Sequence, residues 1–154
     1  MSSSVTKAKY IRREIIASAI INSLFSAGFF LGIFGGHDQV TVWGVGNYAF
    51  DFLPQSFAIG LMASLVPGLL THKAVGAGKI SDFSGTRPTV SLIVQHAIRY
   101  AVIASLLGSG LCALMLWISG LELIAYHAAF MLKILYGVLL GALVTRLVLG
   151  RMIA

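Results

Sequence analysis

The chain has 154 residues, of which 58% are hydrophobic and 10% are charged, whereas about 25% of residues are charged in ordinary globular proteins. This composition, with a mean hydropathy of +0.92, excludes a soluble globular domain and predicts an integral membrane protein. The net charge of +6 is typical of nucleic-acid-binding proteins, but the basic residues lie in segments that flank apolar runs, which argues against such a partner.

The first expected span covers residues 12–34 and contains an apolar run of about membrane length, residues 15–34, which ends at two glycines. Residues 1–9 are polar and rich in serine, so we expect them to be mobile or helical only toward their end. Basic residues before an apolar run also occur in signal peptides, but no A-x-A-like cleavage site follows, and we predict a retained span. Residues 37–47 predict a short, partly extended outer loop, with Trp43 and Tyr48 at headgroup level.

The second expected span covers residues 52–71 and begins with two features of a helix start. Asp51 is placed to cap it, and Pro54 lies in the first turn, where a missing N–H costs little. Pro67 lies deeper, cannot donate a hydrogen bond to the carbonyl of Ala63, and therefore predicts a kink. We interpret this kink as a feature of packing, with a gating hinge as the alternative.

Residues 72–96 form the expected cytoplasmic loop, and the third span covers residues 97–118. The apolar pattern after Pro88 has no helix breaker before the glycines near residue 108, and such a helix is longer than the ~30 Å hydrocarbon core. We therefore predict that residues 89–100 form a helix continuous with the third span. The residues of this segment that should face protein or lipid are Val90, Ile93, Val94 and Ala97. A flexible loop that serves topology alone is the alternative.

A fourth span over residues 123–149 follows a tight outer turn. The four spans predict an all-α fold, an antiparallel four-helix transmembrane bundle that forms a single domain over residues 1–154. The loops after the first and third spans contain no Lys or Arg, whereas the N-terminal segment, the loop after the second span and the C-terminal region do. Because cytoplasmic loops keep the cations, we expect both termini in the cytoplasm and the chain in a bacterial inner membrane.

A faint internal repeat links the two expected hairpins. Ser23, Leu24 and Gly28 of the first span match Ser105, Leu106 and Gly110 of the third at the same offset. Both hairpins run in the same direction, so this pattern predicts a parallel duplication of a two-helix unit, with chance similarity of apolar helices as the alternative.

Small residues at four-residue spacing occur in every span and predict close packing, because helices in lipid approach each other where side chains are small. The expected packing positions are Gly28, Gly32, Gly36, Gly60, Ser64, Gly68, Gly137 and Gly141. A water path lined by such residues is the alternative. Stripes on all four helices favour a tight bundle, with one stripe available for self-association.

Ionisable residues inside a membrane are costly, so they are the first candidates for a functional site. Lys133 lies within the fourth span and Asp51 at the outer start of the second, which predicts an ion pair at similar depth. Alternatively, Lys133 extends to the outer surface and Asp51 is only a helix cap. Asn22 and Gln55 are expected to form hydrogen bonds between helices.

The sequence contains no Ser-His-Asp, Cys-His, H-E-x-x-H or paired-carboxylate pattern, so we assign no catalytic or metal-binding residue. Haem could be held by His72 with His96, or by His37 with His127. All four histidines lie at span ends rather than in the interior, where a shielded haem needs its ligands, and we expect no cofactor.

The stretch FLPQSFAIGLMASLVPGLLTHK, with its proline-entered span and V-P-G-L-L ending, resembles small uncharacterised bacterial inner-membrane proteins of two or four helices. The resemblance implies no activity. We expect a small membrane protein that serves as an accessory, assembly or structural subunit. The alternative is an oligomeric small-solute or ion transporter or channel that uses Asp51 and Lys133. The expected partners are the lipid bilayer and either further copies of the chain or a larger membrane complex.

Overall fold

The computed structural model describes residues 5–36 and 38–153. It is all-helical apart from one short strand pair, and four of its helices are long and apolar enough to cross a membrane. The third of these is continuous but contains a π-helical segment, so it is divided into three parts. The elements in chain order are α1 (Lys7–Phe34), β1 (Gln39–Thr41), α2 (Tyr48–Gly76), α3 (Val90–Ile103), the π-helical segment (Ala104–Gly108), α4 (Ser109–Ser119), β2 (Leu123–Ala125) and α5 (Tyr126–Met152).

The start of α1 is held by a segment distant in sequence. The carboxylate of Asp82 accepts a hydrogen bond from the backbone N–H of Lys7 at 2.7 Å, and Val5 forms a parallel bridge with Ile80. The Thr6 side chain accepts from the N–H of Lys9, so two oxygens serve the unpaired donors of the first turn. The expectation that residues 1–9 are helical only toward their end is confirmed for residues 7–9, where α1 begins, and residues 1–4 lie outside the described part.

The second helix is longer than its expected span. It begins at Tyr48 with Asn47 as the N-cap residue, so Asp51 lies in the first turn rather than at the cap. It continues to Gly76, so the loop covers residues 77–89 instead of 72–96. Lys73 lies in the last turn, where a cation stabilises the helix dipole, and this allows the helix to run beyond its apolar stretch.

The predicted continuous third helix is confirmed over residues 90–119. Its start is capped by Thr89, whose side chain accepts a hydrogen bond from the N–H of Leu92. Ile93 and Ala97 are buried, whereas Val90 and Val94 are exposed. The π-helical segment was not predicted from the sequence, because an extra residue in a helical turn leaves the composition unchanged.

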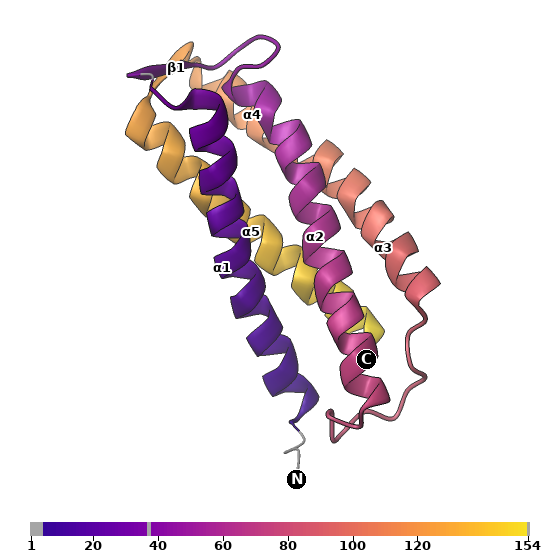
Figure 1. The fold of residues 1–154 in the computed structure, drawn as a ribbon. Helices are drawn as coiled ribbons and strands as arrows, with labels where there is room; N and C mark the ends of the chain where they lie inside the picture. Colours follow the sequence, from indigo (N-terminus) through magenta and orange to yellow (C-terminus); the bar gives the residue numbers. More distant parts are fainter. Residues whose placement is uncertain (1–4, 37, 154) are drawn as a thin grey trace.

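The end of the bundle opposite the chain termini is closed by an antiparallel pairing of β1 with β2 (Figure 1). Val40 lies opposite Ile124, and both side chains are buried. The fourth span therefore does not begin at residue 123 as predicted: residues 123–125 are a strand, and α5 starts at Tyr126. The Tyr48 ring packs inside the bundle, with only 1% of the residue's surface exposed.

The four long helices pack so that α2 is in contact with each of the other three (Figure 1). The remaining large interface joins α1 to α5, so the two hairpins contact each other through α1–α5, α2–α3 and α2–α5. If the first helices of the two hairpins are exchanged, and likewise the second helices, α1–α5 becomes α2–α3 and α2–α5 is unchanged. The contacts thus have an approximate twofold relation.

Three contacts between the hairpins share one sequence offset. Asp51 and Lys133 form an ion pair, Thr145 donates to the carbonyl of Ala63, and both pairs are 82 residues apart. Thr41 pairs with Leu123 in the strand register, at the same separation. In a twofold arrangement, equivalent residues meet at the axis. Since the sequence repeat has this offset too, the contacts favour duplication over chance similarity.

Candidate functional site: a buried polar network

The polar core begins with one face of α1. Its buried residues recur every four positions and are mostly polar in the middle of the helix: Tyr10, Glu14, Ser18, Asn22, Ser26, Phe30 and Phe34. The opposing stripe on α5 has the same spacing and small residues at its centre: Ala129, Lys133, Gly137, Gly141 and Thr145. Rows of this spacing are inclined to the helix axis, so the two helices cross obliquely, as Figure 1 shows.

The two glycines of α5 are where α1 approaches most closely. A Cβ atom at Gly137 would clash with the Ser26 hydroxyl and lie 3.0 Å from the backbone oxygen of Asn22. One at Gly141 would lie 2.8 Å from the Cγ atom of Asn22. Only glycine leaves room for the polar stripe of α1 at these positions.

The packing positions expected on α2 lie against α3. A Cβ atom at Gly60 would lie 2.9 Å from the Cα atom of Ala101, and one at Gly68 would lie 2.7 Å from Ile93. Ser64 is buried and donates its hydroxyl hydrogen to the carbonyl of Gly60. Five of the eight expected packing positions therefore lie at helix interfaces.

The three glycines expected to pack on α1 do not. Gly28, Gly32 and Gly36 are exposed, and an added Cβ atom at any of them meets nothing within 4 Å. They are displaced by two residues from Ser26, Phe30 and Phe34, which is about 200° around a helix. Packing of these three glycines within one copy of the chain was wrongly predicted, because spacing identifies a stripe but not the direction it faces; the expectation that one stripe is available for self-association stays a prediction. For a helix surrounded by lipid, the polar face is the one that must turn toward the other helices.

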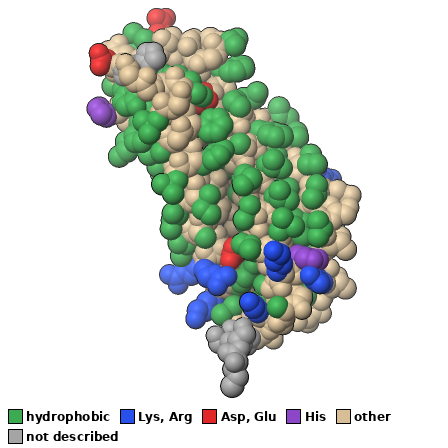
Figure 2. Space-filling view, in the orientation of Figure 1, with side chains coloured by type: hydrophobic (Ala, Val, Ile, Leu, Met, Phe, Trp, Pro, Cys, Tyr) green, Lys and Arg blue, Asp and Glu red, His purple; other side chains and the backbone are tan. Residues whose placement is uncertain are grey.

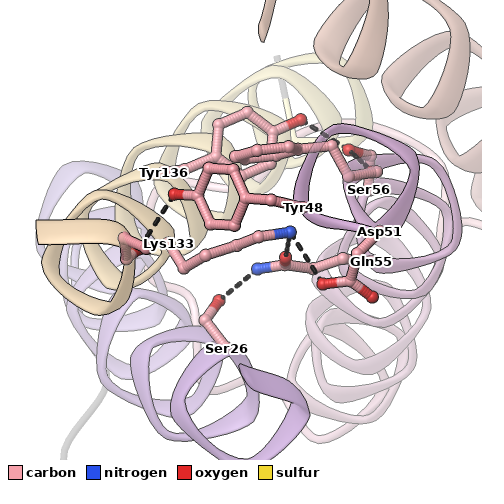
Figure 3. Close-up of polar contacts among 9 residues, drawn as sticks. Ser26, Tyr48, Asp51, Gln55, Ser56, Lys133 and Tyr136 are labelled. Atoms are coloured by element: carbon pink, nitrogen blue, oxygen red, sulfur yellow. Dashed lines mark hydrogen bonds and ion pairs between the residues drawn. The ribbon is translucent and has the colours of Figure 1, made fainter. Parts of the chain in front are cut away.

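Asp51, Lys133 and Gln55 meet at the centre of the site (Figure 3). The Lys133 Nζ atom lies 2.7 Å from a carboxylate oxygen of Asp51 and donates to the amide oxygen of Gln55 at 2.9 Å. The Gln55 amide donates in turn to the Ser26 hydroxyl. Exposed fractions are 0% for Lys133 and 3% for the Asp51 side chain. The lysine is therefore buried within the bundle, and the aspartate is an ion-pair partner and not the cap of α2.

Aromatic rings enclose the ammonium group. Its nitrogen lies 3.7 Å from the centre of the Phe52 ring and 5.0 Å from that of Tyr48. The Tyr48 hydroxyl donates to the backbone oxygen of Ala129, which fixes the ring against α5. Ring faces attract a cation and exclude water, so they stabilise the charge away from solvent. Sequence reasoning did not assign either aromatic residue to this site, although Phe52 follows Asp51 directly and Tyr48 lies one helical turn before it.

A second network lies nearer the chain termini. The Thr145 hydroxyl approaches both the hydroxyl of Ser18 and the carbonyl of Ala63, at 2.8 and 3.0 Å. Pro67 is the residue that leaves this carbonyl without its helical donor, so α5 supplies the missing hydrogen bond. Asn22 donates to Ser18 on its own helix, not to Gln55. Pro67 is buried and is thus part of a helix interface, which is consistent with a role in packing.

Every buried side-chain nitrogen or oxygen in the described residues has a hydrogen-bond partner, with the exception of the Tyr100 hydroxyl. Glu14 is buried and is paired with the exposed Arg13 at 3.1 Å. The Tyr136 hydroxyl is bonded to Ser56, at the edge of the Lys133 site (Figure 3). In the sequence, this polar core is marked by the polar residues that recur every four positions in α1. The stripe of small residues that was predicted to pack does not coincide with them.

Among the described histidines, His72 has neither ring nitrogen free for a haem iron. One ring nitrogen of His72 contacts the carbonyl of Pro88 and the other contacts the Arg87 guanidinium, so both nitrogens are occupied. His96 lies on α3, His127 packs its ring on Tyr126, and His37 lies outside the described residues. Within the described part of the chain, no group of three or more His, Cys, Asp or Glu side chains could hold a metal ion.

Comparison with protein-family models, curated proteins and solved structures finds no match to this chain. The resemblance carried by residues 52–73 therefore brings no family assignment.

Proposed function

We propose that the protein is a non-enzymatic accessory, assembly or structural subunit of a bacterial inner membrane, with four spans and both termini in the cytoplasm. The observation that carries this proposal is the closed state of the Lys133 site. The charges contact each other, Gln55 and aromatic rings, and neither side chain is exposed. A pair held this way fixes the relative position of α2 and α5, which is a structural role.

The charge distribution supports the orientation. Lys and Arg gather at the end of the bundle where both termini lie, whereas Lys133 is in the core (Figure 2). The charged residues in the turns at the other end are Asp38 and Glu122. Cations are retained on the cytoplasmic side, so this asymmetry favours termini in the cytoplasm.

A reporter-fusion series tests the orientation. A periplasm-active reporter should be active when fused at residue 40 or 121 and silent at residue 80. The reverse pattern would show that the orientation is wrong, whatever the protein's role.

The second candidate function is transport by an oligomer that uses the same pair. It is favoured by the general cost of ionisable groups in lipid, which are usually retained for ion or substrate movement. For a transporter, the charges must separate or exchange partners during the cycle. For a structural subunit, they must stay together.

One set of variants distinguishes the structural subunit from the transporter. We would compare wild type, Asp51→Asn with Lys133→Met, and the exchanged pair Asp51→Lys with Lys133→Asp, measuring assembly mass in mild detergent and ion flux in proteoliposomes. A structural subunit should form a stoichiometric complex with a different protein and keep it in the neutral double variant. A homo-oligomer whose flux is lost in the neutral variant and partly restored by the exchange would overturn the proposal.

A further inference from the structure

An apolar groove runs between the third span and α5. It has a volume of about 440 Å³, with one wall from Tyr100 to Leu111 and the other from Tyr136 to Leu147. The groove includes the π-helical segment and the small residue Gly108, where an added Cβ atom would clash with the Tyr136 hydroxyl. Its leucines are largely exposed, with 70% of Leu107 accessible, so the groove opens to the surroundings of the bundle.

A second, basic pocket continues from one end of this groove. It has a volume of about 340 Å³ and is lined by His96, Arg99 and Arg151, together with three residues that also line the groove. The shared residues are Tyr100, Ile103 and Leu147. The Arg151 guanidinium lies 5.9 Å from the centre of the Tyr100 ring, which directs it toward the junction. The combined cavity is therefore an apolar groove with a cationic mouth, which is the end lined by His96, Arg99 and Arg151.

The positive charge of this mouth is not neutralised within the described protein. The two acidic residues at this end of the bundle have other partners: Glu14 pairs with Arg13, and Asp82 accepts from the N–H of Lys7. The ion pairs of the described residues do not include Arg99 or Arg151. An anion at the mouth would thus meet two guanidinium groups without a competing carboxylate from the described residues.

The length of the groove fits one leaflet of a membrane. From Tyr100 to Leu111 a helix rises about 16 Å, and half of the hydrocarbon core is about 15 Å. An acyl chain that starts at the basic mouth would end near the middle of the bilayer. A second copy of the chain or an apolar partner helix would fill the groove but leave both arginines without an anion.

We propose that this combined site binds one anionic glycerophospholipid, with an acyl chain in the groove and its phosphate on Arg99 and Arg151. Guanidinium groups match phosphate oxygens with paired hydrogen bonds, and basic pockets between membrane helices favour anionic headgroups. The proposed orientation assigns the lipid to the cytoplasmic leaflet. The site itself does not depend on the accessory role.

Native mass spectrometry of the full-length protein in detergent tests this site. The probes are dioleoyl phosphatidylglycerol, dioleoyl phosphatidylcholine with the same chains, and inorganic phosphate. Each arginine is expected to contribute about fivefold in affinity. Phosphatidylglycerol should bind as a single adduct, the Arg99→Gln, Arg151→Gln variant should bind it about 25-fold more weakly, and inorganic phosphate should not bind.

Two matched controls define the outcome. Arg12→Gln with Lys73→Gln removes the same charge from the same end and should leave the single adduct intact. Leu107→Trp should block the groove and reduce binding, whereas Leu114→Trp, on the same span outside the groove, should not; melting curves confirm that each variant is folded. Equal affinity for both lipids, equal loss in the charge control, or a lipid-free dimer that Leu107→Trp disrupts would overturn the proposal.

Discussion

The Lys133 ammonium group is the costliest side-chain charge to place in this protein, and its surroundings explain why it is tolerated. It has an opposite charge at 2.7 Å, an amide oxygen at 2.9 Å and a ring face at 3.7 Å. Each partner comes from α2, so one lysine on α5 specifies the register between the two helices. A buried pair adds little net stability, but removing one partner leaves a charge unsatisfied.

The difference between removing the whole pair and removing one partner gives a prediction for single residues. Lys133→Met or Asp51→Asn alone should lower the free energy of unfolding by about 3–5 kcal/mol, because each leaves a buried group without its partner. The variant with both substitutions should lose less free energy of unfolding than the sum of the two single losses. Denaturant titration in detergent micelles measures this, with Lys73→Met as a control at an exposed lysine. Additive single effects would show that the pair is not coupled.

Two tyrosine hydroxyls provide a second residue-scale comparison. The Tyr100 hydroxyl is buried without a partner in the described residues, whereas that of Tyr136 is bonded to Ser56. Tyr100→Phe should leave stability unchanged or raise it, because no hydrogen bond is lost. Tyr136→Phe should lower it by about 1 kcal/mol. The same unfolding measurement decides, and a larger loss in Tyr100→Phe would contradict the assignment.

At the scale of the helix, Pro67 and Thr145 form a unit that neither segment shows alone. Proline removes the donor for the Ala63 carbonyl, and threonine on α5 replaces it. Thr145→Val should lower the free energy of unfolding by about 1–2 kcal/mol, because it leaves a buried carbonyl unpaired. In a Pro67→Ala background the helix regains its own donor, so the same substitution should cost less. A double-mutant cycle with no coupling energy would contradict this account.

Glycine positions on α1 and α5 give a matched test of helix faces. Gly141→Ala should destabilise the protein by about 1–3 kcal/mol, because its methyl group overlaps Asn22. Gly28→Ala should be neutral or stabilising, since its methyl group meets nothing and alanine is the better helix former. If both substitutions were equally damaging, the outward direction of the Gly28 stripe would be wrong.

Length and composition were enough to predict four helices, because the signal for a membrane-spanning helix is local. The strand at residues 123–125 was missed, since its apolar residues are also compatible with a helix start and its partner β1 lies far away in sequence. The orientation of the α1 stripes was missed because Gly28 and Ser26 are both small: the buried face is marked by its polar repeat and not by the size of its residues. In the site, Asp51 and Lys133 were identified as rare charges. Phe52 is a common residue type without such a signal, and Ser26 is marked only by the polar repeat of α1.

For the whole molecule, the shared offset predicts that the two hairpins are separable units. Asp51 and Lys133 occupy equivalent positions, and in two identical hairpins they would be the same residue, with like charges facing each other at the axis. Duplication allows one copy to become acidic and the other basic, so the pair also enforces the pairing of unlike hairpins. The pair would then prevent each hairpin from assembling with itself.

Chains 1–85 and 86–154, expressed together, should therefore assemble and purify as one complex. Lys133→Asp in the second chain should abolish assembly, because two carboxylates would face each other without a cation. Adding Asp51→Lys to the first chain should partly restore it, since the opposite charges are only exchanged. Co-purification of differently tagged halves measures each case. Assembly that survives Lys133→Asp alone would show that the strand pair and the α1–α5 interface suffice, and that the charges at the axis do not select the partner.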